Sequence, residues 1–109
     1  MGVTKTAIFT ERQNNLARMM KAMAHPARIA IIQYLLKTDA CVCGEIVTEV
    51  GLAQATISQH LKELKNAGLI KGTIEGTSVC YCIDGKNFRA TVKELERFFT
   101  LAPVQKSCC

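Results

Sequence analysis

Six cysteines form three close pairs, and they are the residues of this chain whose type and spacing point most directly to chemistry. The pairs are Cys41 with Cys43, Cys80 with Cys82, and Cys108 with Cys109. Thiolate sulfur is a soft ligand that selects soft metals and metalloids over Mg²⁺ or Ca²⁺. Disulfide frameworks belong to secreted proteins, so paired cysteines in a cytoplasmic chain favour thiol chemistry, either ion binding or redox.

Cys41 and Cys43 have one residue between them, so both thiolates can bind the same soft centre. A third ligand must come from elsewhere. Cys108 and Cys109 follow Pro103 on an expected C-terminal tail, and a trigonal site that combines the two pairs is one possibility. The alternatives are that Cys43 is a small core residue, since free cysteine is often buried, and that the tail thiols are incidental.

Cys80 and Cys82 are placed by strand alternation on the face opposite Val79, Tyr81 and Ile83, so we expect them to be more exposed than those three. They are a second soft site, a redox pair or incidental, and we favour incidental. Neighbours on one face of one strand are poorly placed to form a disulfide with each other.

The elements that must position these residues fit one domain. A chain of 109 residues with 49% hydrophobic and 21% charged residues is globular in composition and leaves no room for a second fold. Helical periodicity and alternation predict a mainly α fold with a β-hairpin: helices over about 10–24, 26–37, 45–50 and 54–67, strands over 70–75 and 78–83, and a last helix that Pro103 ends. We expect a single domain over 1–109, with a core over 10–102 and a tail over 103–109. The helix over 26–37 is apolar on nearly all sides and should be the buried central helix.

The helices over 45–50 and 54–67, with Gly51 between them, predict a helix-turn-helix, and the hairpin is then its wing. On the second of these helices the apolar residues Ile57, Leu61 and Leu64 share one face, and polar residues share the other. Side chains at such a surface read base edges or bind phosphates. The candidate DNA-binding residues are Gln54, Thr56, Ser58, Gln59, Lys62, Lys65 and Lys71. From periodicity alone, a merely solvated amphipathic helix explains the pattern equally well.

The net charge of +5, from 14 basic and 9 acidic residues, favours an acidic partner such as double-stranded DNA. The charge is not concentrated on the motif, because residues 41–83 hold three basic and four acidic residues. Any affinity for DNA must therefore come from how the side chains are arranged. No apolar segment approaches the ~18 residues that span a bilayer, so we expect a cytoplasmic protein with no membrane partner.

Residues 58–70, SQHLKELKNAGLI, closely resemble the recognition helix and first wing strand of the ArsR/SmtB family of bacterial winged-helix repressors. Residues 24–28, AHPAR, resemble the family's signature at the start of the preceding long helix. The resemblance covers roughly residues 14 to 100. It implies a homodimer joined through the first and last helices, which represses its own operon until a metal, metalloid or oxidant lowers its affinity for DNA.

Residues 41–43, Cys-Val-Cys, resemble the cysteine box of the family's metal sensors. The match is partial, because Gly44 adds one residue before the helix that begins at Glu45, and Ile46 stands where some members have a third cysteine. His25 is expected to cap a helix and His60 to be structural. Residues 86–102 contain no histidine, so the family's zinc site on the last helix is not expected. We therefore expect As(III) or Sb(III) as effector, followed by Cd(II), Pb(II) or Cu(I), and no obligatory cofactor.

Two other functions compete with this prediction. A repressor of the same fold whose cysteines sense oxidants or persulfides uses the same DNA surface and differs only in the thiol reaction. A thiol metallochaperone or redox enzyme has no DNA role, but the chain lacks a Cys-x-x-Cys motif between a strand and a helix, and it lacks a paired-acid or nucleophile-and-base constellation. We therefore do not expect an enzyme.

Overall fold

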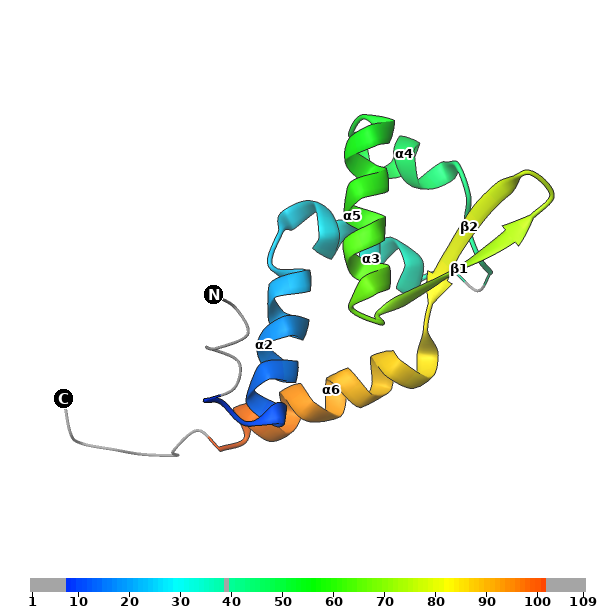
Figure 1. Ribbon diagram of the computed structural model, residues 1–109. Coiled ribbons are helices and arrows are strands. Elements are labelled where there is room, and N and C mark those ends of the chain that lie inside the picture. The colour runs from blue at the N-terminus through cyan, green and yellow to red at the C-terminus, as the bar shows by residue number, and fades with distance from the viewer. Residues whose placement is uncertain (1–7, 39, 102–109) are drawn as a thin grey trace.

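The computed structural model describes residues 8–38 and 40–101, which fold into five helices and one two-stranded antiparallel sheet in this part of the chain (Figure 1). In chain order the elements are α2 (Glu11–Met23), α3 (Pro26–Leu36), α4 (Glu45–Val50), α5 (Gln54–Asn66), β1 (Ile70–Glu75), β2 (Ser78–Ile83) and α6 (Gly85–Phe99). The mainly α fold with a hairpin wing is as predicted, and α4 and both strands have the predicted bounds. Within the described ranges no helix is long and apolar enough to cross a membrane.

Local side-chain caps set the starts of three helices. Thr10 and Gln13 form a capping box at α2, with both backbone-to-side-chain bonds 3.0 Å long. The Nδ1 atom of His25 accepts the backbone N–H of Ala27 at 3.0 Å, and Pro26 occupies the first turn of α3, as the predicted cap requires. Asp84 caps α6 by accepting the N–H of Asn87.

The hydrophobic core lies where α3, α4, α5 and the base of the hairpin meet. Its members are Ala22, Ile31, Ile32, Leu35, Val42, Ile46, Ile57, Leu61, Leu64, Leu69 and Ile70. The helix α3 is central, but the prediction that it is buried on nearly all sides is wrong for Ile29 and Leu36, which are 39% and 53% exposed in this single chain. The core fixes α5 through one face and leaves its opposite face in solvent.

The helix α6 leads away from the hairpin and crosses the N-terminal half of α2 (Figure 1). An ion pair joins the two helices, with 3.6 Å between Arg12 Nε and Glu94 Oε1. The predicted helix end at Pro103 is wrong: α6 ends at Phe99, and the hydroxyl of its C-cap, Thr100, donates to the carbonyl of Arg97 at 2.9 Å. This bond pairs one of the carbonyls that the last turn of the helix leaves without a partner inside the helix.

Candidate DNA-binding surface and thiol cluster

The exposed face of α5 is the candidate DNA-binding surface. Ile57 and Leu64 are fully buried and anchor the helix in the core, and the turn before it is made by Gly51, whose φ of 81° is a left-handed conformation that suits glycine. All seven residues predicted from the sequence are exposed: Gln54, Thr56, Ser58, Gln59, Lys62, Lys65 and, on β1, Lys71. The fold therefore brings the predicted set to the outside of the helix-turn-helix and the base of its wing.

Three of these side chains, Gln54, Ser58 and Gln59, already make contacts within the helix. Gln54 Nε2 donates to Ser58 Oγ at 3.2 Å, and Gln59 Nε2 donates to Glu63 Oε2 at 3.2 Å. Both bonds are on the surface, where exchange for another partner costs little. They hold the amides along the helix without removing them from solvent.

Behind this surface, α5 is tied to the start of α3 by a polar cluster that sequence reasoning missed. Arg28 Nε donates to His60 Nδ1 at 3.1 Å, and Arg28 Nη1 donates to the carbonyl of Ala22 at 3.1 Å. The His25 and His60 rings lie 4.4 Å apart. Burial lowers the pKa of His60, and the neighbouring His25 and Arg28 lower it further, so His60 stays neutral and accepts from the guanidinium.

A groove of about 350 Å³ runs between α5, α4 and the hairpin. The helix α5 contributes Gln54 and Ser58 to its walls, and the facing walls include Cys43 and Val79. The candidate DNA-binding surface and the predicted thiol site are therefore walls of the same groove. A displacement of Cys43 would therefore occur beside Gln54 and Ser58, in the N-terminal half of α5.

The thiol cluster consists of Cys41, Cys43, Cys80 and Cys82. It forms where a single β-bridge joins residues 41–43, the segment before α4, to strand β2 of the wing. Val42 N donates to Tyr81 O at 2.9 Å, and Tyr81 N donates to Val42 O at 2.7 Å. In an antiparallel bridge of this kind the flanking residues lie opposite each other in the closer, non-hydrogen-bonded positions. Cys43 therefore faces Cys80, and Cys41 faces Cys82.

Cys43 and Cys80 form a disulfide, with their Cα atoms 4.1 Å apart and 37 residues apart in the sequence. Cys41 and Cys82 are free thiols. Burial raises the pKa of the Cys82 thiol, and a side-chain hydrogen bond with Cys41 raises it further, whereas the nearby Lys71 acts in the opposite direction. In this state the cluster consists of one oxidised pair and one reduced pair.

One prediction about the strand cysteines is wrong. Cys80 is fully buried, whereas Val79, expected to be less exposed than Cys80, is 46% exposed. The prediction from strand alternation assumed that one face of the hairpin is open to solvent. The segment before α4 instead lies against β2, and its Cys43 is bonded to Cys80. Each of the two faces a cysteine of the predicted metal box, and the expectation that Cys80 and Cys82 have no functional role stays a prediction. The disulfide joins Cys80 to Cys43 and leaves Cys82 free.

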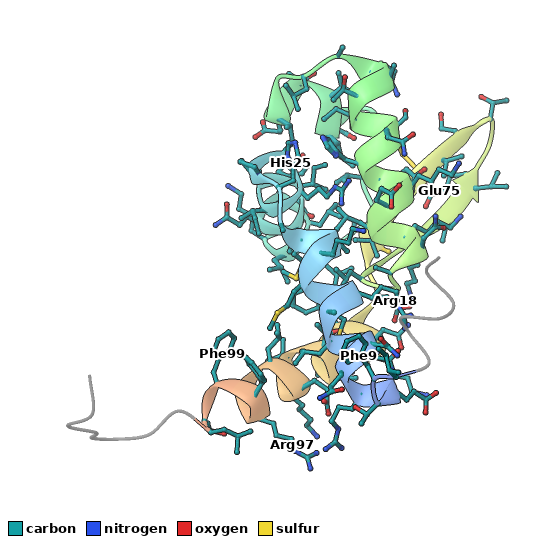
Figure 2. All side chains as sticks on the ribbon, turned by 60° about the vertical axis from the view of Figure 1, so that its left-hand side comes forward. Phe9, Arg18, His25, Glu75, Arg97 and Phe99 are labelled. Carbon is teal, nitrogen blue, oxygen red and sulfur yellow. A yellow bond between two sulfur atoms is a disulfide. The ribbon has the colours of Figure 1, made fainter. Side chains whose placement is uncertain are left out.

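Among the described residues, one group of side chains has the proximity of metal ligands: Cys43, Cys80 and Glu75, whose candidate ligand atoms lie within 4.8 Å of one another. Glu75 is at the end of β1 on the hairpin (Figure 2). The structure does not bring Cys41 and Cys43 into such a group by themselves. Cys108 and Cys109 lie outside the described residues.

An exposed apolar surface lies at the other end of the molecule, where α2 and α6 meet. Figure 2 shows Phe99 on α6, far from the hairpin that holds Glu75, and Phe99 is 62% exposed. Other apolar side chains exposed at this end are Ile8, Phe9, Val92, Phe98 and Leu101. A soluble monomer rarely leaves so many large apolar side chains together in water, so this end has the character of an association surface.

Comparison with known proteins agrees with this arrangement. The family model described as "Bacterial regulatory protein, arsR family" matches residues 25–71, which run from the cap of α3 into β1. The chain is 30% identical over 97 residues to the HTH-type transcriptional regulator CmtR of Mycobacterium tuberculosis, covering 89% of this chain and 81% of CmtR.

Solved structures give the same fold. HlyU from Vibrio cholerae superposes with a TM-score of 0.67 at 28% identity, over 84% of this chain and 99% of HlyU. The homodimeric winged helix-turn-helix DNA-binding domain of Mb0332 from Mycobacterium bovis gives a TM-score of 0.64 at 27% identity, over 92% of this chain and 98% of that domain. The extent of the match to CmtR, together with the family match over the helix-turn-helix, shows that this chain belongs to the ArsR family of bacterial regulatory proteins.

Proposed function

We propose that this ArsR-family transcriptional regulator is a repressor that binds operator DNA as a homodimer and is released when a thiophilic effector binds its cysteines. The family consists of DNA-binding regulators and not of enzymes. The direction of regulation is part of the proposal, since HlyU of Vibrio cholerae, 32% identical over 95 residues, is named a transcriptional activator. The observation that carries the proposal is the shared groove: Cys43 and Ser58 lie in its walls.

On DNA, the exposed face of α5 enters the major groove and the hairpin lies beside it. Ser58 and Gln59 read base edges, with the Gln59 amide suited to adenine N6 and N7. Lys62, Lys65 and Lys71 bind phosphates, and Gln54 and Thr56, in the first turn of α5, contact the backbone. The tie from Arg28 to His60 holds α5 at a fixed angle to α3, which this reading of bases requires.

The dimer forms through α2 and α6. Their exposed apolar residues, Phe99 above all, are covered by the same residues of a second copy, as in the isologous interface of a two-fold dimer. Such a dimer presents two copies of α5, and half-sites one helical turn apart are the usual geometry for the motif.

The proposed effector is As(III) or Sb(III), with Cd(II), Pb(II) and Cu(I) as further candidates. Cys41 and Cys43 displace two hydroxide ligands of the arsenic hydroxide as water, and a third thiol displaces the last. Because Cys43 lines the groove beside α5, an ion held there shifts the angle between α5 and the wing. A coupling of ~1–3 kcal/mol between effector and operator is the usual allosteric range.

A redox repressor is the second candidate, and the Cys43–Cys80 disulfide favours it. In that reaction the two thiols lose two electrons and two protons, and one molecule of hydrogen peroxide is reduced to two waters. The resulting bond ties the segment before α4 to β2. The effector is then an oxidant, and no ion is needed.

The test begins with a duplex selected from a random library by the reduced protein. Fluorescence anisotropy with this duplex measures the dissociation constant under argon with a phosphine reductant, before and after addition of As(III). Release under these conditions supports ion sensing. Failure to bind any duplex would contradict the proposed function, and release by peroxide but not by As(III) would establish the redox candidate in its place.

A further inference from the structure

All four cysteines of the described residues lie on one face of a small three-stranded arrangement. The Val42–Tyr81 bridge adds residues 41–43 to the free edge of β2 as a third, short strand. Cys41 and Cys43 are two residues apart, as are Cys80 and Cys82, so each pair shares a face. The cross-strand pairing makes it the same face.

The other side of β2 continues the arrangement. In the hairpin register Thr73 lies opposite Cys80, and Lys71 lies opposite Cys82. The carboxylate of Glu75 is within 4.8 Å of the Cys43 and Cys80 sulfurs. Two rows of side chains therefore cross the three strands, with two thiols and Thr73 in one row and two thiols and Lys71 in the next.

In the described state the Cys43 and Cys80 sulfurs group with Glu75 and with neither Cys41 nor Cys82, so a common ion requires rotation of the side chains once the disulfide is reduced. Facing cysteines at the Cys43–Cys80 position have Cα atoms 4.1 Å apart. The two rows are separated by the rise of two strand residues, about 6.7 Å between Cα atoms, and rotation about χ1 brings neighbouring sulfurs closer than their Cα atoms. Cys41 lies opposite Cys82 in the register that the Val42–Tyr81 bridge sets, so these two residues face each other as Cys43 and Cys80 do.

We propose that Cys41, Cys43, Cys80 and Cys82 of the reduced protein form a single four-thiol site that binds one thiophilic ion between the segment before α4 and the wing strand β2. The regulatory role of this site rests on the proposed function. The site supplies the ligands that the proposed function does not name, beyond Cys41 and Cys43. A soft divalent ion uses all four thiolates in a tetrahedron, and As(III) uses three of them. The missing ligands thus come from β2, and the C-terminal tail is not required.

Charge and protons balance in this reaction. Four thiols release four protons when they bind a divalent ion, and the complex carries two negative charges. Lys71, opposite Cys82, offsets part of that charge. Glu75 is a hard oxygen ligand and adds more negative charge, so we expect it to stay outside the first coordination shell of a soft ion.

Disulfide formation and ion binding exclude each other, because both use the Cys43 and Cys80 sulfurs. A disulfide sulfur carries no thiolate charge and is not a ligand of the site. Oxidation by hydrogen peroxide, which takes two electrons and two protons from this pair, therefore empties the site. Conversely, a bound ion protects the pair from oxidation.

Cd(II) alone is the probe for the test. Native mass spectrometry of the reduced full-length protein should show one Cd(II) per chain, and the thiolate-to-cadmium charge-transfer band should saturate at the same ratio. Cys80→Ser and Cys82→Ser should each weaken Cd(II) binding on the order of 10-fold or more, since even the loss of a group that hydrogen-bonds a metal ligand costs 10–100-fold. The matched control is the double variant Cys108→Ser/Cys109→Ser, which removes two thiols from the tail and should bind Cd(II) like the wild type.

Cys80 is fully buried, so Cys80→Ser is also checked by circular dichroism, and a second measurement uses the wild type only. Reduced protein with and without Cd(II) is treated with hydrogen peroxide, and peptide mapping counts the Cys43–Cys80 disulfide. Protection by one equivalent of Cd(II) is expected. Unchanged disulfide formation would overturn the site.

Two other results would also overturn it. One is loss of Cd(II) binding in the tail control. The other is that Glu75→Gln weakens Cd(II) binding while Cys82→Ser binds Cd(II) as tightly as the wild type. These outcomes leave the proposed function standing if As(III) still releases DNA through Cys41 and Cys43. Failure of DNA binding, in turn, leaves the ion site standing.

Discussion

Cys41 lies directly opposite Cys82 across a one-residue β-bridge, although 41 positions separate them in the chain. The bridge exists because Val42 and Tyr81 exchange both backbone hydrogen bonds, and Val42 is buried in the core. One apolar residue thus holds the cysteine box against the wing. A chemical event at the cysteines therefore acts directly on the segment before α4 and on β2, which the bridge and the disulfide join.

On the candidate DNA-binding surface, Lys62→Ala should lower the affinity for every duplex, whereas Gln59→Ala should lower the sequence specificity. Lys62→Ala should weaken binding to all duplexes alike and reduce the slope of log affinity against log salt by about 0.9, because one phosphate contact is lost. Gln59→Ala should cost about 1–3 kcal/mol mainly at one base pair. Anisotropy titrations against the selected duplex and its single-base variants separate the two, and equal effects on every sequence would remove Gln59 from base reading.

For the dimer, Phe99→Glu should give a monomer, because it places a charge in the apolar surface at the α2–α6 end. Ile74→Glu is the matched control: Ile74 is 79% exposed at the tip of the hairpin, and the same change there should leave the dimer intact. Sedimentation velocity measures both. A dimeric Phe99→Glu, or a monomeric Ile74→Glu, would place the interface elsewhere.

Oxidation should stabilise the fold. The Cys43–Cys80 bond spans 37 positions and constrains the unfolded chain, which contributes roughly 2–4 kcal/mol in the chain-entropy account. Urea unfolding of the oxidised and reduced wild type measures the difference. It should vanish in Cys43→Ser and persist in Cys108→Ser/Cys109→Ser, and a difference that persists in Cys43→Ser would mean that another pair is oxidised.

Stability should also fall in mild acid because of His60. Its pKa is lowered from the ordinary 6.5, so the unfolded chain binds more protons than the folded one below that pH. The free energy of unfolding contributed by His60 is complete above pH 6.5 and is lost as the pH falls through the lowered pKa. His60→Gln retains an acceptor for Arg28 and should flatten this decline in urea titrations between pH 8 and 5. Equal slopes for the variant and the wild type would rule out His60 as the source.

The sequence predicted the elements better than it predicted their contacts. Periodicity and alternation are local signals, and they located α4, α5 and both strands to within a residue. The Cys43–Cys80 pairing has no such signal, because residues 41–43 are too few to show an alternation and their partner is 37 residues away. The bond from Arg28 to His60 was missed for the same reason, since it joins two helices across 32 positions.

At the thiol cluster, the type and spacing of the residues were better guides to its members than their expected burial. The spacing of the cysteines predicted a site at 41–43, which the structure places beside Cys80 and Cys82, whereas the burial of Cys80 depends on this segment, which is distant in the sequence. The helix α6 ends at Phe99, before the end that Pro103 predicted, and the apolar repeat did not reveal this end.

The most direct measurement of the central claim is the dissociation constant of the reduced homodimer for its selected duplex, with and without As(III), in the wild type and in Cys41→Ser/Cys43→Ser. A coupling of ~1–3 kcal/mol predicts that As(III) weakens wild-type binding about 5–150-fold. The double variant should bind the duplex as tightly as the wild type and show no response to As(III). Normal release of the double variant by As(III) would contradict the claim that the thiol cluster controls DNA binding.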